Sequence, residues 1–360
     1  MRERSGSVLQ ESVCIADGRM AAPVRNLDYL NCGVTAINDT TVPEDVLEKH
    51  ALLFVGGWLQ QQGYRFATVT PATQARVNAR LESARAKDLR DVFGWSRPFP
   101  PGLLDARVLG WLRQAHLLSS AGDGLLRSKV RFSSLGEQLF AHSAYPTADA
   151  DAVFFGPDTV RFAALIEAEL QRVPVPRGGR ILDMGCGAGP GGIVAAQLAA
   201  ASQPELVLAD INTRALRYAD ANVALAGVQR ASFAQGDLFA PVVGTFDLIV
   251  ANPPYLNDSA KRTYRHGGGA WGGGLSERIV LEGLPRLAPG GRLVLYTGAA
   301  IVRGADPLLA SLRPHLETRG WQWRYRELDP DVFGEELAEP AYAGAERIAA
   351  VALVVHRPVP

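Results

Sequence analysis

Four consecutive residues, Asn252-Pro253-Pro254-Tyr255, combine a side-chain amide, two rigid imino acids and an aromatic ring. They follow the apolar run 246–251, which has the composition of a buried strand, so we expect them at the carboxyl edge of a sheet, where ligands bind. The Asn252 side-chain oxygen and the Pro253 carbonyl can accept both N–H bonds of one planar nitrogen. The prolines fix the backbone, and Tyr255 can stack on a flat substrate. The motif therefore predicts a site that orients the lone pair of an amide or exocyclic amino nitrogen for attack on an electrophile.

A second cluster of residues with chemical potential occupies 181–189, where a short apolar strand ends in an acid and three glycines follow at alternate positions. Gly185, Gly187 and Gly189 allow the backbone to turn sharply and to approach a ligand closely, and the next helix presents its N-terminal amides there. Another apolar strand ends in Asp210, 21 residues after Gly189, where a carboxylate can accept both ribose hydroxyls. The spacing predicts a cofactor that contains a nucleoside.

The same glycines also fit the G-x-G-x-x-G pattern of dinucleotide sites, through residues 187–192. Asp183 disfavours that alternative, because a carboxylate before the glycines would repel a pyrophosphate and attract the ammonium group of an amino-acid cofactor. Asp237 closes a later strand beside the apolar Leu238, so it is the predicted contact to the adenine amino group, with a simple turn cap as its alternative. These residues favour S-adenosylmethionine over NAD.

A glycine-rich run, 266–275, comes soon after the Asn-Pro-Pro-Tyr motif. So many glycines are hard to keep rigid without a ligand, so we interpret the run as a lid. Trp271 at its centre would either cover a planar substrate or anchor the loop at the surface. His266 is interpreted as a loop residue, and no spacing of Cys, His and Asp predicts a metal site.

From residue 158 onward the chain alternates between helical and strand-like segments, which is typical of a doubly wound α/β sheet covered on both faces. We expect a seven-stranded sheet that ends in an antiparallel hairpin. The expected helices are 158–172, 190–201, 214–226 and 276–287. The expected strands are 180–184, 206–210, 231–236, 246–251, 292–296, 321–328 and 347–356.

The first 150 residues have a different character. Residues 1–22 are polar and aperiodic, which predicts a flexible terminus, and Thr41 to Glu44 have capping-box spacing before a helix that ends near Gly63. Helices are also expected over 71–92 and 103–118, followed by strands at 129–135 and 138–145. The sequence thus predicts an α+β, winged-helix-like domain over 23–150 that recognises the substrate, and a cofactor-binding domain over 151–360.

Composition limits the classes of partner. The 360 residues include 37 Lys and Arg and 37 Asp and Glu, so no global positive field recruits nucleic acid or an anionic membrane. The segment 76–131 is an exception, because it has eleven basic and five acidic residues; charge therefore leaves nucleic acid open without favouring it. The three scattered cysteines and the lack of a long apolar run predict a cytoplasmic protein that does not bind membranes. An amphipathic helix within 23–95 needs a partner, which is either a second copy of the chain or its own C-terminal domain.

These residues together resemble the HemK-like branch of class I methyltransferases, which includes release-factor glutamine methyltransferases and enzymes that act on nucleobase amino groups. The resemblance covers about residues 153–357 and includes Pro157-Asp158-Thr159 and Asn222. The 150 preceding residues depart from the family, whose N-terminal domain is shorter. The contacts that the resemblance implies are Asn252 to Tyr255 for the substrate, and Thr159, Asp183, Gly185, Asp210, Asp237, Leu238 and Asn252 for the cofactor.

The sequence therefore predicts an S-adenosylmethionine-dependent methyltransferase that acts on a planar nitrogen of a protein side-chain amide, a nucleobase or a small metabolite. One alternative is an O- or C-methyltransferase that uses the same loop only to shape its pocket. Another alternative, from a different class, is a nucleic-acid-binding protein whose methyltransferase-like domain is inactive.

Overall fold

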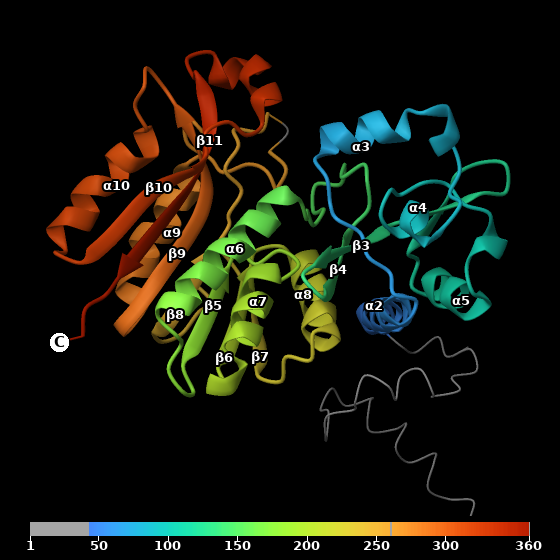
Figure 1. Ribbon diagram of the computed structural model, residues 1–360, viewed down its shortest axis with the longest axis horizontal. Coiled ribbons are helices and arrows are strands. Elements are labelled where there is room, and N and C mark those ends of the chain that lie inside the picture. The colour runs from blue at the N-terminus through green and yellow to red at the C-terminus, as the bar shows by residue number, and fades with distance from the viewer. Residues whose placement is uncertain (1–42, 260, 360) are drawn as a thin grey trace, which may run out of the picture. The chain divides into compact units, whose positions relative to one another are not determined.

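The computed structural model describes residues 43–259 and 261–359, which belong to one compact unit. The predicted flexible terminus at 1–22 and the predicted cap at Thr41 lie outside the described residues. Within this unit we treat the N-terminal region (43–150) and the sheet region (151–359) separately (Figure 1). The predicted domain boundary near residue 150 remains a prediction.

The sheet region is built on seven strands in the order β10-β11-β9-β8-β5-β6-β7. The five strands from β9 to β7 are parallel, whereas β11 pairs antiparallel with both β9 and β10. The predicted doubly wound sheet with a C-terminal antiparallel hairpin is thereby confirmed. Its strands are β5 (Arg180–Met184), β6 (Glu205–Asp210), β7 (Ala231–Gln235), β8 (Phe246–Ala251), β9 (Leu287–Ile301), β10 (Gln322–Asp329) and β11 (Arg347–His356).

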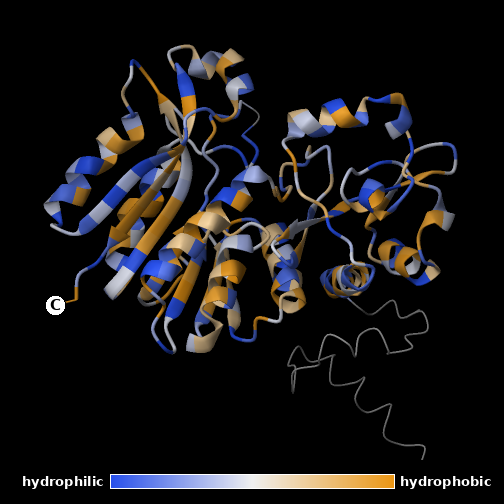
Figure 2. Ribbon diagram, viewed as in Figure 1, coloured by the Kyte–Doolittle hydropathy of each residue, from blue (hydrophilic) through white to orange (hydrophobic). Residues whose placement is uncertain are grey.

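Helices cover both faces of the sheet because alternate side chains of each central strand point to opposite sides. Ile181 and Leu248 join one buried cluster under α6, α7 and α8, while Leu182 and Ile249 join the other under α9 and α10. The central strands are accordingly hydrophobic along most of their length (Figure 2). The helices are α6 (Pro157–Arg172), α7 (Pro190–Leu198), α8 (Thr213–Leu225), α9 (Gly274–Gly283) and α10 (Pro307–Thr318).

The chain order reverses at β5, which lies between β6 and β8. At such a switch point the loops that leave the two neighbouring strands diverge and open a crevice at their carboxyl ends. The glycine loop follows β5, Asp210 ends β6, and Asn252 follows β8. The topology therefore brings the three sequence motifs to one place.

The N-terminal region contains four helices and two β-hairpins, which confirms its predicted α+β character. Strand β3 pairs with β4 as expected, and an additional short hairpin joins β1 and β2. The expected single helix over 71–92 is wrong, because Thr70 and Asp88 each cap a separate helix and a turn intervenes. The elements are α2 (Glu44–Gln61), α3 (Pro71–Asn78), α4 (Leu89–Phe93), α5 (Ala106–Gln114), β1 (Leu118–Ser120), β2 (Leu126–Ser128), β3 (Val130–Leu135) and β4 (Gln138–Ser143).

Helix α2 finds its partner in the same chain, since it packs against α8 of the sheet region. The two helices approach closely at Gly56, where a β-carbon would come within 2.7 Å of Leu225. An ion pair between Lys49 and Asp220 at 2.7 Å flanks this contact. The sequence analysis gave this helix two possible partners, a second copy of the chain or the chain's own C-terminal domain. In the structure, the C-terminal part of the same chain covers the helix.

Two elements differ from the sequence expectation in the sheet region. Strand β9 is longer than the expected 292–296, and helix α10 was not expected at all. The signals for α10 were present: Asp306 caps it by accepting a hydrogen bond from the Leu309 amide at 3.0 Å, Pro307 follows, and Leu308, Leu312 and Leu316 recur every four residues and are buried.

Candidate active site

One cavity of about 560 Å³ lies at the carboxyl ends of β5, β6 and β8. It is lined by residues of both regions, and the predicted site residues contribute to it from several separate segments. Among the predicted residues, its lining includes Thr159, Asp183, Gly185, Gly187, Asp210, Asp237, Leu238 and Asn252 to Tyr255. Gly189 lies behind this lining, at the start of α7.

The glycine loop has the backbone that its sequence predicts. Gly185, Gly187 and Gly189 have φ angles of +67°, +54° and +82°, a region that residues with a β-carbon rarely adopt. Behind the loop, the Gly192 amide donates a hydrogen bond of 2.7 Å to Asp183 Oδ2. Burial raises the pKa of Asp183 to about 7, although this hydrogen bond acts in the opposite direction. Asp183 is therefore a carboxyl group that a nearby cation would ionise.

Asp210 faces the same loop from the end of β6. Its Oδ2 accepts from the Gly187 amide and its Oδ1 from the Asn212 amide, both at 2.8 Å. Burial raises its pKa, while these backbone hydrogen bonds lower it. Each carboxylate oxygen keeps a second lone pair, so Asp210 can hold the loop and still accept hydrogen bonds from a ligand.

Asp237 and Leu238 follow β7 and line the same cavity. The Asp237 side chain is exposed and pairs with Arg278 of α9 at 2.9 Å, whereas Leu238 is buried and has a φ angle of +44°. The structure thus places an apolar side chain against the cavity and an acid at its rim.

Asn222 of α8 links the glycine loop to the N-terminal region. Its side chain is fully buried and bonds both the amide and the carbonyl of Ala141 on β4, at 2.8 and 3.0 Å. The same amide group donates to the Ala188 carbonyl at 2.9 Å. One side chain therefore positions the loop between Gly187 and Gly189 against the hairpin of the other region.

The Asn-Pro-Pro-Tyr motif separates into a free amide and an anchored ring. Asn252 is half-buried and lines the cavity, and no hydrogen bond links its side chain to another described residue. Tyr255 is buried, and its hydroxyl donates to Asp158 Oδ2 at 2.5 Å. Its ring packs edge-on against Phe333 and against Gly298, where a β-carbon would collide with it at 2.2 Å. The ring thus secures the loop that presents Asn252.

Asp158 accepts hydrogen bonds from several side chains, a role that the sequence motifs alone did not predict. Besides Tyr255, it accepts from the Tyr296 hydroxyl at 2.7 Å and from Arg161 at 3.1 Å. The neighbouring Thr159 has a structural contact, since its hydroxyl accepts from the Gly156 amide at 3.4 Å at the start of α6. The signal for this role was the adjacent acid-threonine pair, but Tyr296 lies on a distant strand that no local pattern connects to it.

The glycine-rich run is not the loose lid that its composition suggested. The Gly267 amide donates to the Leu256 carbonyl at 2.8 Å and the Leu275 amide to the Gly267 carbonyl at 2.7 Å. A β-carbon at Gly272 would lie 2.2 Å from the Tyr255 carbonyl oxygen. The glycines therefore allow close backbone packing against the motif. Trp271 packs on Tyr342 at 6.4 Å, away from the cavity lining, so of its two interpretations the anchor agrees with the structure.

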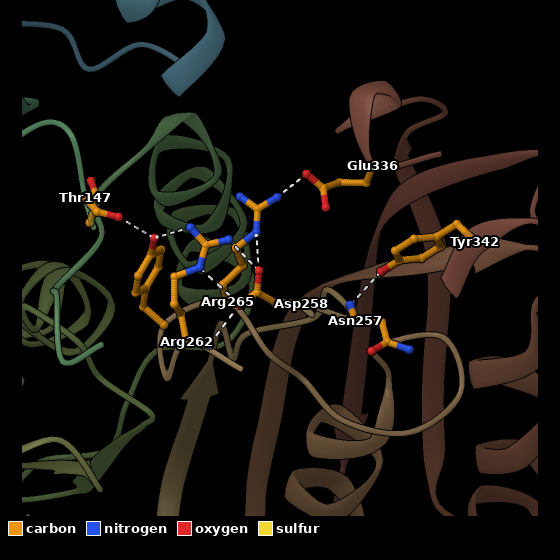
Figure 3. Close-up of polar contacts among 8 residues, drawn as sticks. Thr147, Asn257, Asp258, Arg262, Arg265, Glu336 and Tyr342 are labelled. Carbon is orange, nitrogen blue, oxygen red and sulfur yellow. Dashed lines mark hydrogen bonds and ion pairs between the residues drawn. The ribbon is translucent and has the colours of Figure 1, made fainter. Parts of the chain in front are cut away.

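Residues 257–259 and 261–265, which we call the rim loop, lie between the motif and the glycine-rich run, and 261–265 line the cavity. Figure 3 shows the polar contacts of the rim loop. Asp258 lies at its centre and accepts from the Arg262 amide at 2.8 Å and from the Arg262 side chain. These hydrogen bonds lower the pKa of Asp258. Arg265 approaches Asp258 at 3.4 Å and also pairs with Glu336. The rim loop is therefore cross-linked to the segment between β10 and β11.

The rim loop also contacts the end of the N-terminal region. The Tyr264 hydroxyl donates to the Thr147 carbonyl at 2.7 Å, and its ring stacks on Phe154 with centroids 6.0 Å apart. Both aromatic residues line the cavity, as do Pro71 and Tyr145. Phe154 and Tyr264, which we call the aromatic wall, thus line the same cavity as the glycine loop and Asn252. No local pattern predicts this pairing, because Phe154 and Tyr264 come together only in the tertiary structure.

Among the described residues, no group of three or more His, Cys, Asp and Glu side chains is arranged to hold a metal ion. None of the helices that the structure describes is long and apolar enough to span a membrane.

Comparison with known proteins agrees with the geometry of the site. A family model described as "Methyltransferase small domain" matches residues 163–301. The chain is 36% identical over 257 residues to the release factor glutamine methyltransferase of Deinococcus radiodurans, an alignment that covers 65% of this chain and 87% of that protein.

Shorter alignments link the chain to two other methyltransferases. It is 34% identical to ribosomal RNA small subunit methyltransferase C of Pasteurella multocida, over 36% of each chain. It is 37% identical to the ribosomal protein uL3 glutamine methyltransferase of Bordetella pertussis, over 33% of this chain and 43% of that protein.

The fold and the matches define a class I methyltransferase. The chain belongs to the HemK-like branch of that class, together with the release factor glutamine methyltransferases.

Proposed function

We propose that the protein transfers a methyl group from S-adenosylmethionine to a planar nitrogen. The observation that carries the proposal is the Asn252 amide, which lines the same cavity as the glycine loop and Asp183, at the end of the strand next to β5, without a hydrogen bond to another described residue. An amide left free in this position is available to a ligand, because a polar group in such a cavity is costly unless it is hydrogen-bonded.

The donor half of the cavity fits S-adenosylmethionine. The positive φ angles of Gly185 and Gly187 leave an open backbone surface, and Asp210 has lone pairs for ribose hydroxyls. Asp183, with its pKa raised to about 7, would ionise beside the ammonium group of an amino-acid cofactor. Leu238 offers an apolar contact, and Asp237 a hydrogen-bond acceptor at the rim, for the adenine ring. When bound, the cofactor supplies an electrophilic methyl group on a sulfonium.

The acceptor half would be formed by Asn252 and Pro253. The Asn252 Oδ1 and the Pro253 carbonyl each accept one N–H bond of the acceptor, which holds its nitrogen lone pair toward the methyl group. As the new N–C bond forms, the S–C bond breaks, and the surplus proton leaves the nitrogen for water. Because the proton leaves after transfer, no strong base is required beforehand. Tyr255 and Asp158 would keep the motif in place throughout.

The aromatic wall would bind the flat acceptor group, and Pro71 and Tyr145, which also line the cavity, would give the N-terminal region a part in the choice of acceptor. Phe154 and Tyr264 present ring surface on the side of the cavity near that region, and aromatic faces bind planar groups favourably. The relatives' names identify glutamine side chains and ribosomal RNA as acceptors of those proteins. A protein side-chain amide, a nucleobase and a small planar metabolite are thus the acceptor classes for this chain. Because these relatives act on components of translation, we place the enzyme in the cytoplasm.

Calorimetric titration of the purified protein with S-adenosylmethionine, and separately with NADH, tests the donor half. We expect micromolar binding of the methyl donor and no binding of NADH. Labelled-methyl transfer to peptides, RNA and metabolites, followed by mass spectrometry of the product, then tests the N-methyl assignment. A product methylated on oxygen or carbon would replace that assignment with the O- or C-methyltransferase alternative, and failure to bind the donor would contradict the enzyme itself.

A further inference from the structure

The segment 71–131 of the N-terminal region has a local excess of positive charge within a chain that is neutral overall. Eleven basic and five acidic residues lie between Arg76 and Arg131. This stretch of the chain includes α3, α4, α5 and the β1–β2 hairpin with the segments that connect them (Figure 1). Positive charge that neighbouring acids do not neutralise is available to a partner of opposite charge.

Most of these cations have no acid partner within the described residues. Arg97 pairs with Asp91, Arg107 approaches Asp105 at 3.5 Å, and Arg131 is buried with its guanidinium over the Phe66 ring. In the sheet region, by contrast, more than half of the arginines and lysines form ion pairs with described acids. The cations of 71–131 that form no ion pair with a described acid are Arg76, Arg80, Arg85, Lys87, Arg90, Arg113, Arg127 and Lys129.

The free cations begin close to the active-site cavity. Pro71, the first residue of α3, lines the cavity, and Arg76 lies five residues further along the helix, about 7.5 Å away at 1.5 Å per residue. Arg80 and Arg85 follow beyond the end of α3. Arg76, Arg80 and Arg85 are exposed. We call them the row of cations, because they follow one another along the chain from the cavity-lining Pro71.

The chemistry of this surface favours RNA over a protein partner. Protein interfaces have an apolar and aromatic centre, but Leu81 is the only large hydrophobic side chain exposed between residues 71 and 131. Single-stranded nucleic acid is bound by basic grooves that follow the backbone, combined with aromatic rings on which bases stack. Both features are present: the row of cations, and the Phe154–Tyr264 wall inside the cavity.

We propose that residues 71–131 form a docking surface for single-stranded RNA, with Arg76, Arg80 and Arg85 contacting the phosphates next to a nucleotide whose base enters the cavity. This inference deepens the proposed function and rests on it for one point, the identification of a nucleobase as the acceptor. The docking itself depends only on charge and does not require the methyl donor.

The test is fluorescence anisotropy of a labelled, mixed-sequence single-stranded RNA with the full chain across a range of salt concentrations. The variant Arg76→Gln/Arg80→Gln/Arg85→Gln removes three free cations of the surface. The matched control, Arg172→Gln/Arg177→Gln/Arg303→Gln, removes three exposed arginines of the sheet region that have no ion pair with a described acid. Circular dichroism checks that both variants fold, and Arg76→Gln alone provides a milder second variant.

For single strands, each phosphate contact contributes about 0.7 to the slope of log affinity against log salt, so three lost contacts should reduce the slope by about 2. The same relation gives a loss of affinity of about 50-fold near 150 mM salt, and about threefold to fourfold for Arg76→Gln alone. The control should match the wild type. An unchanged slope in the surface variant, an equal loss in the control, or no RNA binding by the wild type would overturn the docking surface. Calorimetric binding of S-adenosylmethionine is measured separately, so failure of the proposed function is distinguished from failure of the docking.

Discussion

Replacing Asn222 with Ala tests whether one buried amide holds the cofactor loop and the N-terminal hairpin together. Asn222 bonds the amide and carbonyl of Ala141 and the carbonyl of Ala188 at 2.8, 3.0 and 2.9 Å. Its two bonds to Ala141 resemble the pairing of a neighbouring strand, so the side chain completes the outer edge of β4. The substitution removes all three hydrogen bonds from a fully buried position.

The expected cost follows from the groups that lose their partner. One buried N–H group and two buried carbonyls remain, and a buried donor or acceptor left unsatisfied costs about 1–3 kcal/mol. Carbonyls tolerate this better than N–H groups, and a water molecule that enters the vacated space recovers part of the loss. We therefore expect the free energy of unfolding to fall by about 3 kcal/mol, a large value for a single substitution.

The measurement is urea unfolding followed by circular dichroism and tryptophan fluorescence, combined with calorimetric titration of S-adenosylmethionine. Gln229→Ala is the matched control, because it removes an exposed amide that bonds only the nearby Gly227 carbonyl, and it should change stability by less than about 0.5 kcal/mol. We expect Asn222→Ala to weaken donor binding as well, since Ala188 lies between two loop glycines. A stability loss below about 1 kcal/mol, or a loss equal to that of the control, would refute the assigned role.

Three further predictions concern the site itself. Asp210→Ala should weaken donor binding, whereas Asn252→Ala should leave that binding largely intact and abolish methyl transfer; equal loss of binding in both, measured by calorimetry, would contradict the division of roles. Gly272→Ala should reduce both stability and turnover, because the new β-carbon would meet the Tyr255 carbonyl oxygen at 2.2 Å and the φ angle of this residue is +82°. Gly57 has open space around it, so Gly57→Ala should be neutral or stabilising by up to about 1 kcal/mol. Thermal unfolding measures both effects on stability. The pKa of Asp183 is raised to about 7, and a cationic cofactor binds the ionised form of the carboxyl group. Donor affinity should therefore rise with pH up to about 7, by at most tenfold per pH unit, and then level off. Titrations at several pH values should show this slope in the wild type and a flatter one in Asp183→Asn.

The same pKa predicts how stability depends on pH without the cofactor. The folded-state pKa of Asp183, about 7, lies above its ordinary value of 3.8. The contribution of this group to stability is therefore complete below about pH 4 and is lost as the pH rises toward 7. Donor binding should offset this loss, so the stabilisation by S-adenosylmethionine in thermal unfolding should be larger at pH 8 than at pH 6.

The sequence by itself predicted the class of fold and the place of the chemistry, because both depend on short-range patterns. The strands β5 and β8 are mostly apolar, with Asp183 near the end of β5 and Asn252 directly after β8. Parallel strands bring such ends to one edge of the sheet. The positive φ angles of the glycine loop follow from residue type alone. The seven strands and the C-terminal hairpin agreed with expectation for the same reason.

Long-range packing decided what the sequence could not. The glycine-rich run suggested a lid because composition shows only that glycine is flexible, whereas the structure uses the missing β-carbon of Gly272 to pack the run against the motif. Segment 71–92 had helical composition throughout, but Asp88 caps a new helix there and divides it. Local propensity does not reveal whether a glycine serves for flexibility or for close packing, or whether an aspartate continues a helix or caps a new one.

The residues that hold the motif in place and those of the aromatic wall were also beyond the sequence. Tyr255, Asp158 and Tyr296 meet from a loop, a helix and a strand that are far apart in the chain, and the Phe154–Tyr264 wall joins segments more than a hundred residues apart. No periodicity records such contacts, because they arise only when the sheet brings distant segments together. The sequence thus determined the fold class and where the chemistry lies, while the tertiary structure decided which side chains hold Asn252 in place and which form the aromatic wall of the same cavity.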